Sequence, residues 1–218
     1  MPNSEPDPSA LVRPRVYLAG PMVFYRDPDT TFTAMKRICA LHGVNGIAPL
    51  DNQVSLAGIP PGRALVRRIV EADLELMRSL DAGIFCLDGF RRGPDMDPGT
   101  AFEIGYMQAM GKPLVGWTAD PRDYPARVAA YFGDVFGETL RPAPACTLGA
   151  TSGSLRDPDG ILVHSESCYQ NAMTEIGIEL SGGQVFADQD WSRAFAAAVR
   201  DLARRLLGSC QTRTSGKT

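Results

Sequence analysis

A chain of 218 residues, 44% hydrophobic and 22% charged, has the composition of a globular protein large enough for one well-buried core. Its net charge of −3, without a stripe of Lys and Arg, disfavours nucleic-acid binding through a basic face. The five cysteines form no CxxC pair, which indicates reduced thiols. No apolar run reaches 18 residues and the polar, proline-rich start lacks signal-peptide features, so we expect a cytoplasmic protein without a membrane span.

Predicted strands and helices alternate through the first half of the chain. After a lead-in at 1–14 that we expect to be disordered, the apolar pattern predicts strands at 15–20 and 44–50, and helices from about 30 to 42 and from 63 to 80. Thr30 or Thr31 is expected to cap the first helix. Gly20 ends the first strand, and a glycine there allows the backbone to approach a ligand closely. The loop after it lacks GxGxxG, so a dinucleotide fingerprint is absent.

The second half continues this alternation. The pattern predicts strands at 82–87, 113–117 and 182–186, and helices at 100–110, 124–136, 171–180 and 190–207. Gly208 is expected to end the last helix and to leave a polar tail at 208–218. Residues 141–159 are predicted to be a loop or excursion, with a turn at 157–160. The spacing predicts one α/β domain at 15–207, a parallel sheet with helices on both faces.

The stretch from Asp97 to Tyr106 is the strongest candidate for a functional site. It follows a buried strand, and Glu103 is predicted to lie in the first turn of the next helix. A carboxylate there lies near the carboxyl end of the sheet, where open α/β proteins bind ligands. One interpretation is that Glu103 only complements the helix dipole. The other is that Glu103 is a catalytic carboxylate, with Asp97 as its neighbour in the site.

Five segments, in order, resemble the nucleoside 2-deoxyribosyltransferase family. They are Val-Tyr-Leu-Ala-Gly-Pro at 16–21, Pro-Leu-Asp-Asn-Gln at 49–53, Asp-Leu at 73–74, Asp-x-Gly-Thr-Ala-x-Glu-x-Gly-Tyr at 97–106 with Gly-Lys-Pro at 111–113, and Asp-x-Asp-Gly at 157–160 leading to Asn-Ala-Met at 171–173. The resemblance implies a flavodoxin-like, doubly wound parallel sheet of five strands. It favours the catalytic interpretation of Glu103.

The resemblance also implies an activity. It is exchange of the base on a 2′-deoxyribonucleoside, as in nucleotide salvage, through a deoxyribosyl ester on a glutamate and with net retention. Glu103 matches the nucleophile, and Tyr17 matches a tyrosine that orients it. Asp97 and Asp73 match two aspartates that handle the base or its proton, although Asp73 by itself fits an ordinary solvated helix residue.

The resemblance further implies residues that bind substrate. Gln53 matches a glutamine that contacts the base, and Gly20 and Gly99 are expected to line the substrate site. Asn171 and Met173 resemble a pair that reaches the sugar in a neighbouring subunit, which implies a dimer or a multiple of dimers. The alternative is that both are ordinary residues at the start of a helix. The chemistry requires no cofactor or metal, and the expected partners are deoxyribonucleosides and free purine or pyrimidine bases.

Two other functions remain open. An N-glycoside hydrolase of nucleosides or nucleoside monophosphates would use the same nucleophile, with water as the acceptor. A phosphate pocket would then be needed for monophosphates, and Arg26, Arg91 and Arg92 are its candidates, although loop arginines are usually only solvated. A non-catalytic nucleotide-binding or sensor domain is the third possibility. Three carboxylates and Tyr17 argue against it, because a pure binder has no use for a nucleophilic glutamate.

Overall fold

The computed structural model describes residues 13–51, 58–144, 147, 149, 153–164 and 167–214, with backbone alone at 209–214. Its centre is a parallel sheet of five strands in the order β2-β1-β3-β4-β8. The strands are β1 (Arg15–Ala19), β2 (Asn45–Ile47), β3 (Ala82–Cys86), β4 (Leu114–Thr118) and β8 (Val185–Ala187). This order is the flavodoxin-like one, and its direction reverses between β1 and β3.

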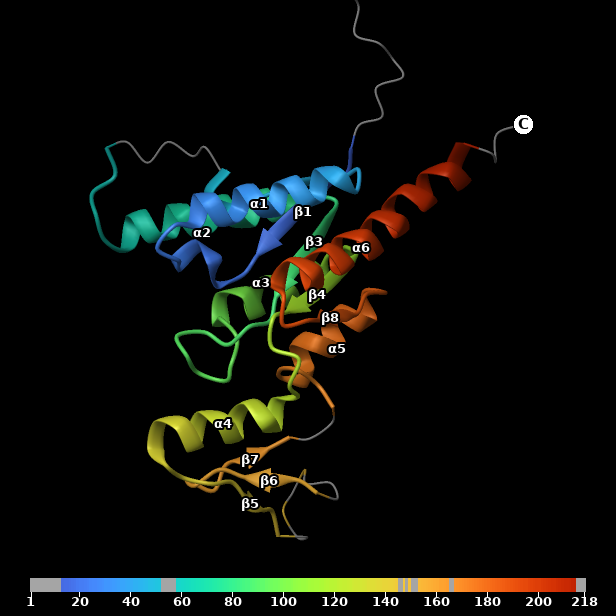
Figure 1. Cartoon of the computed structure of the whole chain (residues 1–218). Coiled ribbons are helices and arrows are strands. Elements are labelled where there is room, and N and C mark those ends of the chain that lie inside the picture. Colours follow the sequence, from blue (N-terminus) through green and yellow to red (C-terminus); the bar gives the residue numbers. More distant parts are fainter. Residues whose placement is uncertain are drawn as a thin grey trace, which may run out of the picture.

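Helices cover both faces of the sheet (Figure 1). They are α1 (Pro28–Leu41), α2 (Arg63–Ser79), α3 (Pro98–Ala109), α5 (Ala172–Leu180) and α6 (Trp191–Thr214). Successive strand residues point to opposite faces, so Val16 and Leu18 pack with α1 and α6, whereas Tyr17 and Ala19 pack with α2, α3 and α5. Two separate apolar cores therefore lie on the two sides of one sheet.

A small lobe stands off the carboxyl end of the sheet, in the lower part of Figure 1. It consists of α4 (Tyr124–Phe136) and an antiparallel sheet of β5 (Arg141–Pro142), β6 (Leu155–Arg156) and β7 (Leu162–Val163). The expected loop at 141–159 is thus partly strand. The turn predicted at 157–160 joins β6 to β7, and Gly160 adopts a positive φ of 85° there.

Two short 3-10 helices follow the first two strands, η1 (Pro21–Phe24) after β1 and η2 (Pro49–Asp51) after β2. Asp51 holds the second of them in place, because its carboxylate accepts from the Ala48 backbone at 2.8 Å and from Lys36 of α1 at 2.5 Å. The end of β2 is therefore fastened to α1. No helix in the described part of the chain is long and apolar enough to cross a membrane.

Three predicted helix boundaries are wrong, and the strands predicted at 44–50 and 182–186 are shorter or shifted, at 45–47 and 185–187. Helix α1 begins at Pro28 and is capped by Asp27, not by Thr30 or Thr31, because the Asp27 carboxylate accepts from the Thr30 backbone. Helix α3 begins at Pro98, two residues before the predicted Thr100. Helix α6 does not end at Gly208 but continues to Thr214; Gly208 lacks the positive φ of a C-cap glycine, and a single helical glycine costs only about 1 kcal/mol.

We predict that Gly20→Ala destabilises the protein. Gly20 has a φ of 154°, and a Cβ there would lie 2.5 Å from Cys86 Cβ and 2.7 Å from Met22 Sδ. The free energy of unfolding should fall by about 2 kcal/mol or more in urea titrations. Gly133→Ala is the control, because Gly133 lies inside α4 with its nearest atom 4.0 Å away, and it should be neutral or stabilising by up to about 1 kcal/mol. Equal stability of the two variants would contradict the prediction.

Candidate active site

A cavity of about 490 Å³ opens at the carboxyl ends of β1, β2 and β3. Gly20 follows β1, Pro49 and Leu50 follow β2, and Asp97 precedes α3, and all four contribute to its wall. The cavity lies where the strand order reverses, which is the usual ligand site of a doubly wound sheet. The ends of several loops therefore meet at one concave surface.

Glu103 and Tyr17 form the central polar contact of this site. The Tyr17 hydroxyl donates to Glu103 Oε1 at 2.7 Å, across 86 residues of sequence. Because α3 begins at Pro98, Glu103 lies in the second turn of the helix and not in the predicted first turn. The helix dipole acts mainly within the first turn, so it gives a poor account of a glutamate at this position. The interpretation that Glu103 only complements the helix dipole is therefore disfavoured.

The surroundings of Glu103 raise its pKa from 4.5 to about 7. Burial is the largest cause, and the negative charges of Asp73 and Asp97 raise the pKa further, whereas the Tyr17 hydrogen bond lowers it. Burial, and then the charge of Glu103, also raise the pKa of Tyr17 above its ordinary value. The phenol stays protonated as a hydrogen-bond donor, and near pH 7 both forms of the Glu103 carboxyl are populated.

Asp97 has a structural task as well as a place in the cavity wall. It is the N-cap of α3, and its Oδ2 accepts from the Thr100 backbone at 2.8 Å and from the Thr100 hydroxyl at 3.0 Å. The cap fixes the start of the helix that carries Glu103. Gly99 also lines the cavity, and a Cβ there would lie 3.0 Å from Asp97 Oδ2. The hydrogen bonds of the cap go to Oδ2.

Asp73 lies on α2 and completes a set of three carboxylates that line the cavity. Its charge raises the pKa of both Glu103 and Tyr17, which places it within electrostatic reach of the pair. The structure therefore brings together all four residues that were expected to be catalytic. Across the described residues, no three His, Cys, Asp or Glu side chains cluster as a metal site would require.

The apolar part of the wall was not predicted from the sequence. It consists mainly of side chains from η1, the end of β2, α2 and α3: Val23, Phe24, Leu50, Ile69, Val70, Leu74, Met77 and Phe102. Ile69 of α2 is 41% exposed and lines the cavity. The missed signal is that Val66 and Val70 lie off the sheet-facing stripe, so α2 is more apolar than packing alone requires.

The remaining predicted ligand residues have three different outcomes. Gly20 lines the cavity as expected. Gln53 lies outside the described residues. Asn171 and Met173 are not in this cavity: Asn171 caps α5 by accepting from the Met173 backbone at 2.9 Å, and Met173 is 85% exposed beside a separate groove on α3 and α5. Within one chain they are helix-start residues.

A family model described as nucleoside 2-deoxyribosyltransferase matches residues 16–173. The chain belongs to the nucleoside 2-deoxyribosyltransferase family. The match includes Tyr17, Asp73, Asp97 and Glu103, so the cavity lies within the family's own segment of the chain. Membership indicates an enzyme of the deoxyribosyltransferase type, with nucleosides and bases as substrates.

One curated relative and two solved structures are similar to this chain over most of its length. A protein of Schizosaccharomyces pombe, itself described as uncharacterized, is 49% identical over 193 residues, which are 88% of this chain and 90% of the relative. A 2-desoxiribosyltransferase from Leishmania mexicana is 24% identical, with a TM-score of 0.56, over 85% of this chain and 97% of its own. A conserved protein from Enterococcus faecalis V583 is 18% identical, with a TM-score of 0.52, over 87% and 99%. At these identities the two structures support the fold.

We predict that Glu103→Gln flattens the pH dependence of stability. Between pH 4.5 and about 7 the native state keeps a proton on Glu103 that the unfolded chain has lost, so stability falls as pH rises through this window. The loss is on the order of 3 kcal/mol in the free energy of unfolding, and the variant should lack it. Urea titrations at pH 4.5, 6 and 8 measure it.

The control for this experiment is Tyr17→Phe, which removes the hydrogen bond that lowers the pKa of Glu103. Its stability should continue to fall above pH 7, because the carboxyl then titrates at a higher pH. If Glu103→Gln and the wild type show the same pH profile, the proposed burial of this carboxyl is wrong.

Proposed function

We propose that this enzyme exchanges the base of 2′-deoxyribonucleosides through a covalent deoxyribosyl ester on Glu103. The observation that carries the proposal is the partly buried Glu103 carboxylate, held by Tyr17 in a cavity with two further carboxylates. A hydrogen bond fixes the carboxylate, and the phenol that donates it stays protonated. This is the arrangement that a carboxylate nucleophile requires.

In the first half of the reaction, the ionised Glu103 carboxylate attacks C1′ of the sugar as the bond from C1′ to the base nitrogen breaks. The transition state has oxocarbenium character, and a 2′-deoxy sugar reaches it more easily because it lacks the electron-withdrawing hydroxyl. Tyr17 keeps Oε1 in place, so less orientational freedom is lost in the transition state. The product is an ester between Glu103 and the sugar.

The departing base must receive a proton, and the cavity holds two candidates to deliver it. Asp97 has one carboxylate oxygen outside its helix cap, and Asp73 faces the same cavity from α2. Whichever of the two delivers the proton must be in its acid form when the bond from C1′ to the base breaks. We assign the base to Asp97, with Asp73 holding the base or the hydrogen bonds of the site.

In the second half, a different base enters and its nitrogen attacks C1′, which releases the Glu103 carboxylate. The same carboxyl group that protonated the first base accepts the proton of the second. Each half inverts C1′, so the exchange retains configuration overall. The whole sequence consists of substitution and proton transfer, and every atom comes from the enzyme, the nucleoside and the base.

The cavity fits an unphosphorylated nucleoside. The described residues that line it include carboxylates and apolar side chains but no Lys, Arg or His. Arg91 instead stacks on Phe90, with 4.8 Å from the guanidinium to the ring centroid, and Arg92 lines a different pocket. A dianionic phosphate near three carboxylates would be repelled. The apolar wall, including Phe102 and Ile69, suits a flat base.

Base exchange is tested by incubating the enzyme with deoxyinosine and adenine and separating the products chromatographically. We expect deoxyadenosine and hypoxanthine from the wild type. Glu103→Gln should be at least about 10³-fold slower, because the neutral amide cannot form the ester, while its circular dichroism stays unchanged. Only free hypoxanthine, with or without adenine, would instead identify a hydrolase with water as acceptor. Near-normal exchange by Glu103→Gln would rule out the mechanism.

We also propose that a second copy of the chain completes the sugar end of the site. Helix α5 exposes Met173, Ile176 and Leu180, which are 85%, 40% and 75% accessible, beside a groove at Gly105 and Gln108 of α3. Exposed apolar side chains grouped along one helix favour self-association. The expected role of Asn171 and Met173 in a neighbouring site requires this contact.

Met173→Asp should therefore shift the protein toward a monomer and lower base exchange by tenfold or more. The change buries a charge in the apolar contact, which costs several kcal/mol. Analytical ultracentrifugation and the exchange assay measure the two effects together. Leu41→Asp is the matched control, since Leu41 ends α1 and is 83% exposed, away from this groove. A fully active monomeric wild type would contradict the proposal.

A further inference from the structure

We propose that Gln170 is a positioning residue that clamps both ends of the loop between β3 and α3. This loop, residues 87–97, ends at Asp97 and leads directly into the helix of Glu103. The inference rests on the proposed function, because it names what holds the Asp97 carboxylate at the cavity. Gln170 lies just before α5, 73 residues beyond Asp97 in sequence, and is outside the cavity wall.

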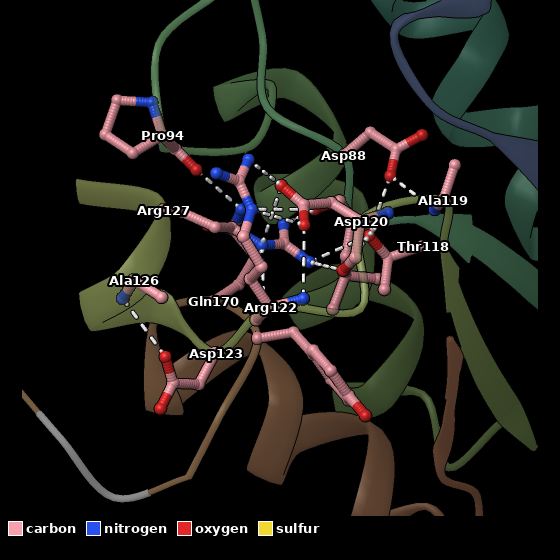
Figure 2. Close-up of polar contacts among 12 residues, drawn as sticks. Asp88, Pro94, Thr118, Ala119, Asp120, Arg122, Asp123, Ala126, Arg127 and Gln170 are labelled. Carbon is pink, nitrogen blue, oxygen red and sulfur yellow. Dashed lines mark hydrogen bonds and ion pairs between the residues drawn. The ribbon is translucent and has the colours of Figure 1, made fainter. Parts of the chain in front are cut away.

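The Gln170 amide makes three hydrogen bonds to the loop. Its Nε2 donates to the Leu87 carbonyl at 3.1 Å and to the Pro94 carbonyl at 2.8 Å, and its Oε1 accepts from the Met96 backbone at 3.1 Å. Leu87 is at the start of the loop, and Met96 directly precedes Asp97. Figure 2 shows Gln170 reaching toward Pro94 beside Arg127. One side chain therefore joins the beginning and the end of the loop.

A glutamine suits this position because the loop presents two acceptors and one donor. An amide has two N–H donors and an acceptor oxygen, which match them, whereas a carboxylate would have no donor for the two carbonyls. Gln170 is only 2% exposed, so an unsatisfied group there would be costly. The backbone of Gln170 is held in turn by Glu175, whose Oε2 accepts from the Tyr169 N–H at 2.7 Å and the Gln170 N–H at 3.4 Å.

Arg127 supports the same end of the sheet but does not repeat the clamp. Its guanidinium donates to the Leu87 carbonyl at 3.0 Å, to the Thr118 hydroxyl at 2.8 Å and to the Asp120 carbonyl at 2.5 Å (Figure 2). These partners are at the ends of β3 and β4, away from Met96 and Asp97. Among the described residues, Gln170 is the one outside the loop that accepts a hydrogen bond from the Met96 backbone.

The test replaces Gln170 with Met, which keeps the length of the side chain and removes all three hydrogen bonds. We expect kcat for base exchange to fall about tenfold to a hundredfold with a smaller change in KM, because the reacting groups are misplaced. Hydrogen exchange should accelerate at the amides of residues 94–100 more than at those of β1 and β4. An unchanged kcat, or acceleration spread evenly over the sheet, would overturn the proposal.

Two further variants make the result specific. Tyr124→Phe removes a hydrogen bond of 2.9 Å to Asp95, on the exposed side of the same loop, and should leave kcat and the exchange of residues 94–100 within about twofold. An effect as large as that of Gln170→Met would overturn the clamp. If Gln170→Met does not fold, Gln170→Asn keeps the amide but shortens it, and the same pattern is expected.

The two proposals fail separately. A wild type that forms neither deoxyadenosine nor hypoxanthine would defeat the proposed function. The hydrogen-exchange comparison would then still decide whether Gln170 fixes the loop, since it needs no substrate and no turnover. If all variants show the same amide hydrogen-exchange rates and the enzyme still exchanges bases normally, only the Gln170 proposal fails.

Discussion

The hydrogen bond between Tyr17 and Glu103 is the contact on which the site depends. It requires β1 and α3 to meet on one face of the sheet, with Tyr17 pointing to that face and Glu103 in the second turn of the helix. Burial of the Tyr17–Glu103 pair also raises the pKa of Glu103 to about 7. A carboxylate with restricted motion and poor solvation is costly for the fold and useful for nucleophilic chemistry.

Stability and chemistry share residues around this pair. Asp97 caps α3 and also lines the cavity, so the start of the helix and the position of the acid cannot vary independently. Gly20 permits the close approach of β1 to Cys86 and shapes the same cavity. The loop before Asp97 is long, and long loops are mobile unless their backbone groups are satisfied. Gln170 satisfies three of them from a distant part of the chain.

The order of strands and helices could be predicted because short uncharged runs end at glycine or proline and alternate with amphipathic segments. The starts of α1 and α3 were misplaced, although a signal was present. Asp27, Asp97 and Asp123 each cap a helix whose first or second residue is proline, and each accepts from the backbone three residues on. Asp97 with Pro98 was interpreted as loop, which displaced Glu103 by half a turn.

The sequence by itself determined the order of the elements of the main sheet, its parallel strands and the chemical identity of the site residues, because these depend on local pattern and on motifs within short segments. The pairing of Tyr17 with Glu103 was implied by the family resemblance, and the tertiary structure supplied its geometry. The tertiary structure also decided contacts that the sequence did not indicate, because it left Met173 exposed outside the cavity and brought Gln170 to both ends of a loop far away in sequence. Such contacts follow from how helices cross a twisted sheet, and no local periodicity encodes that geometry.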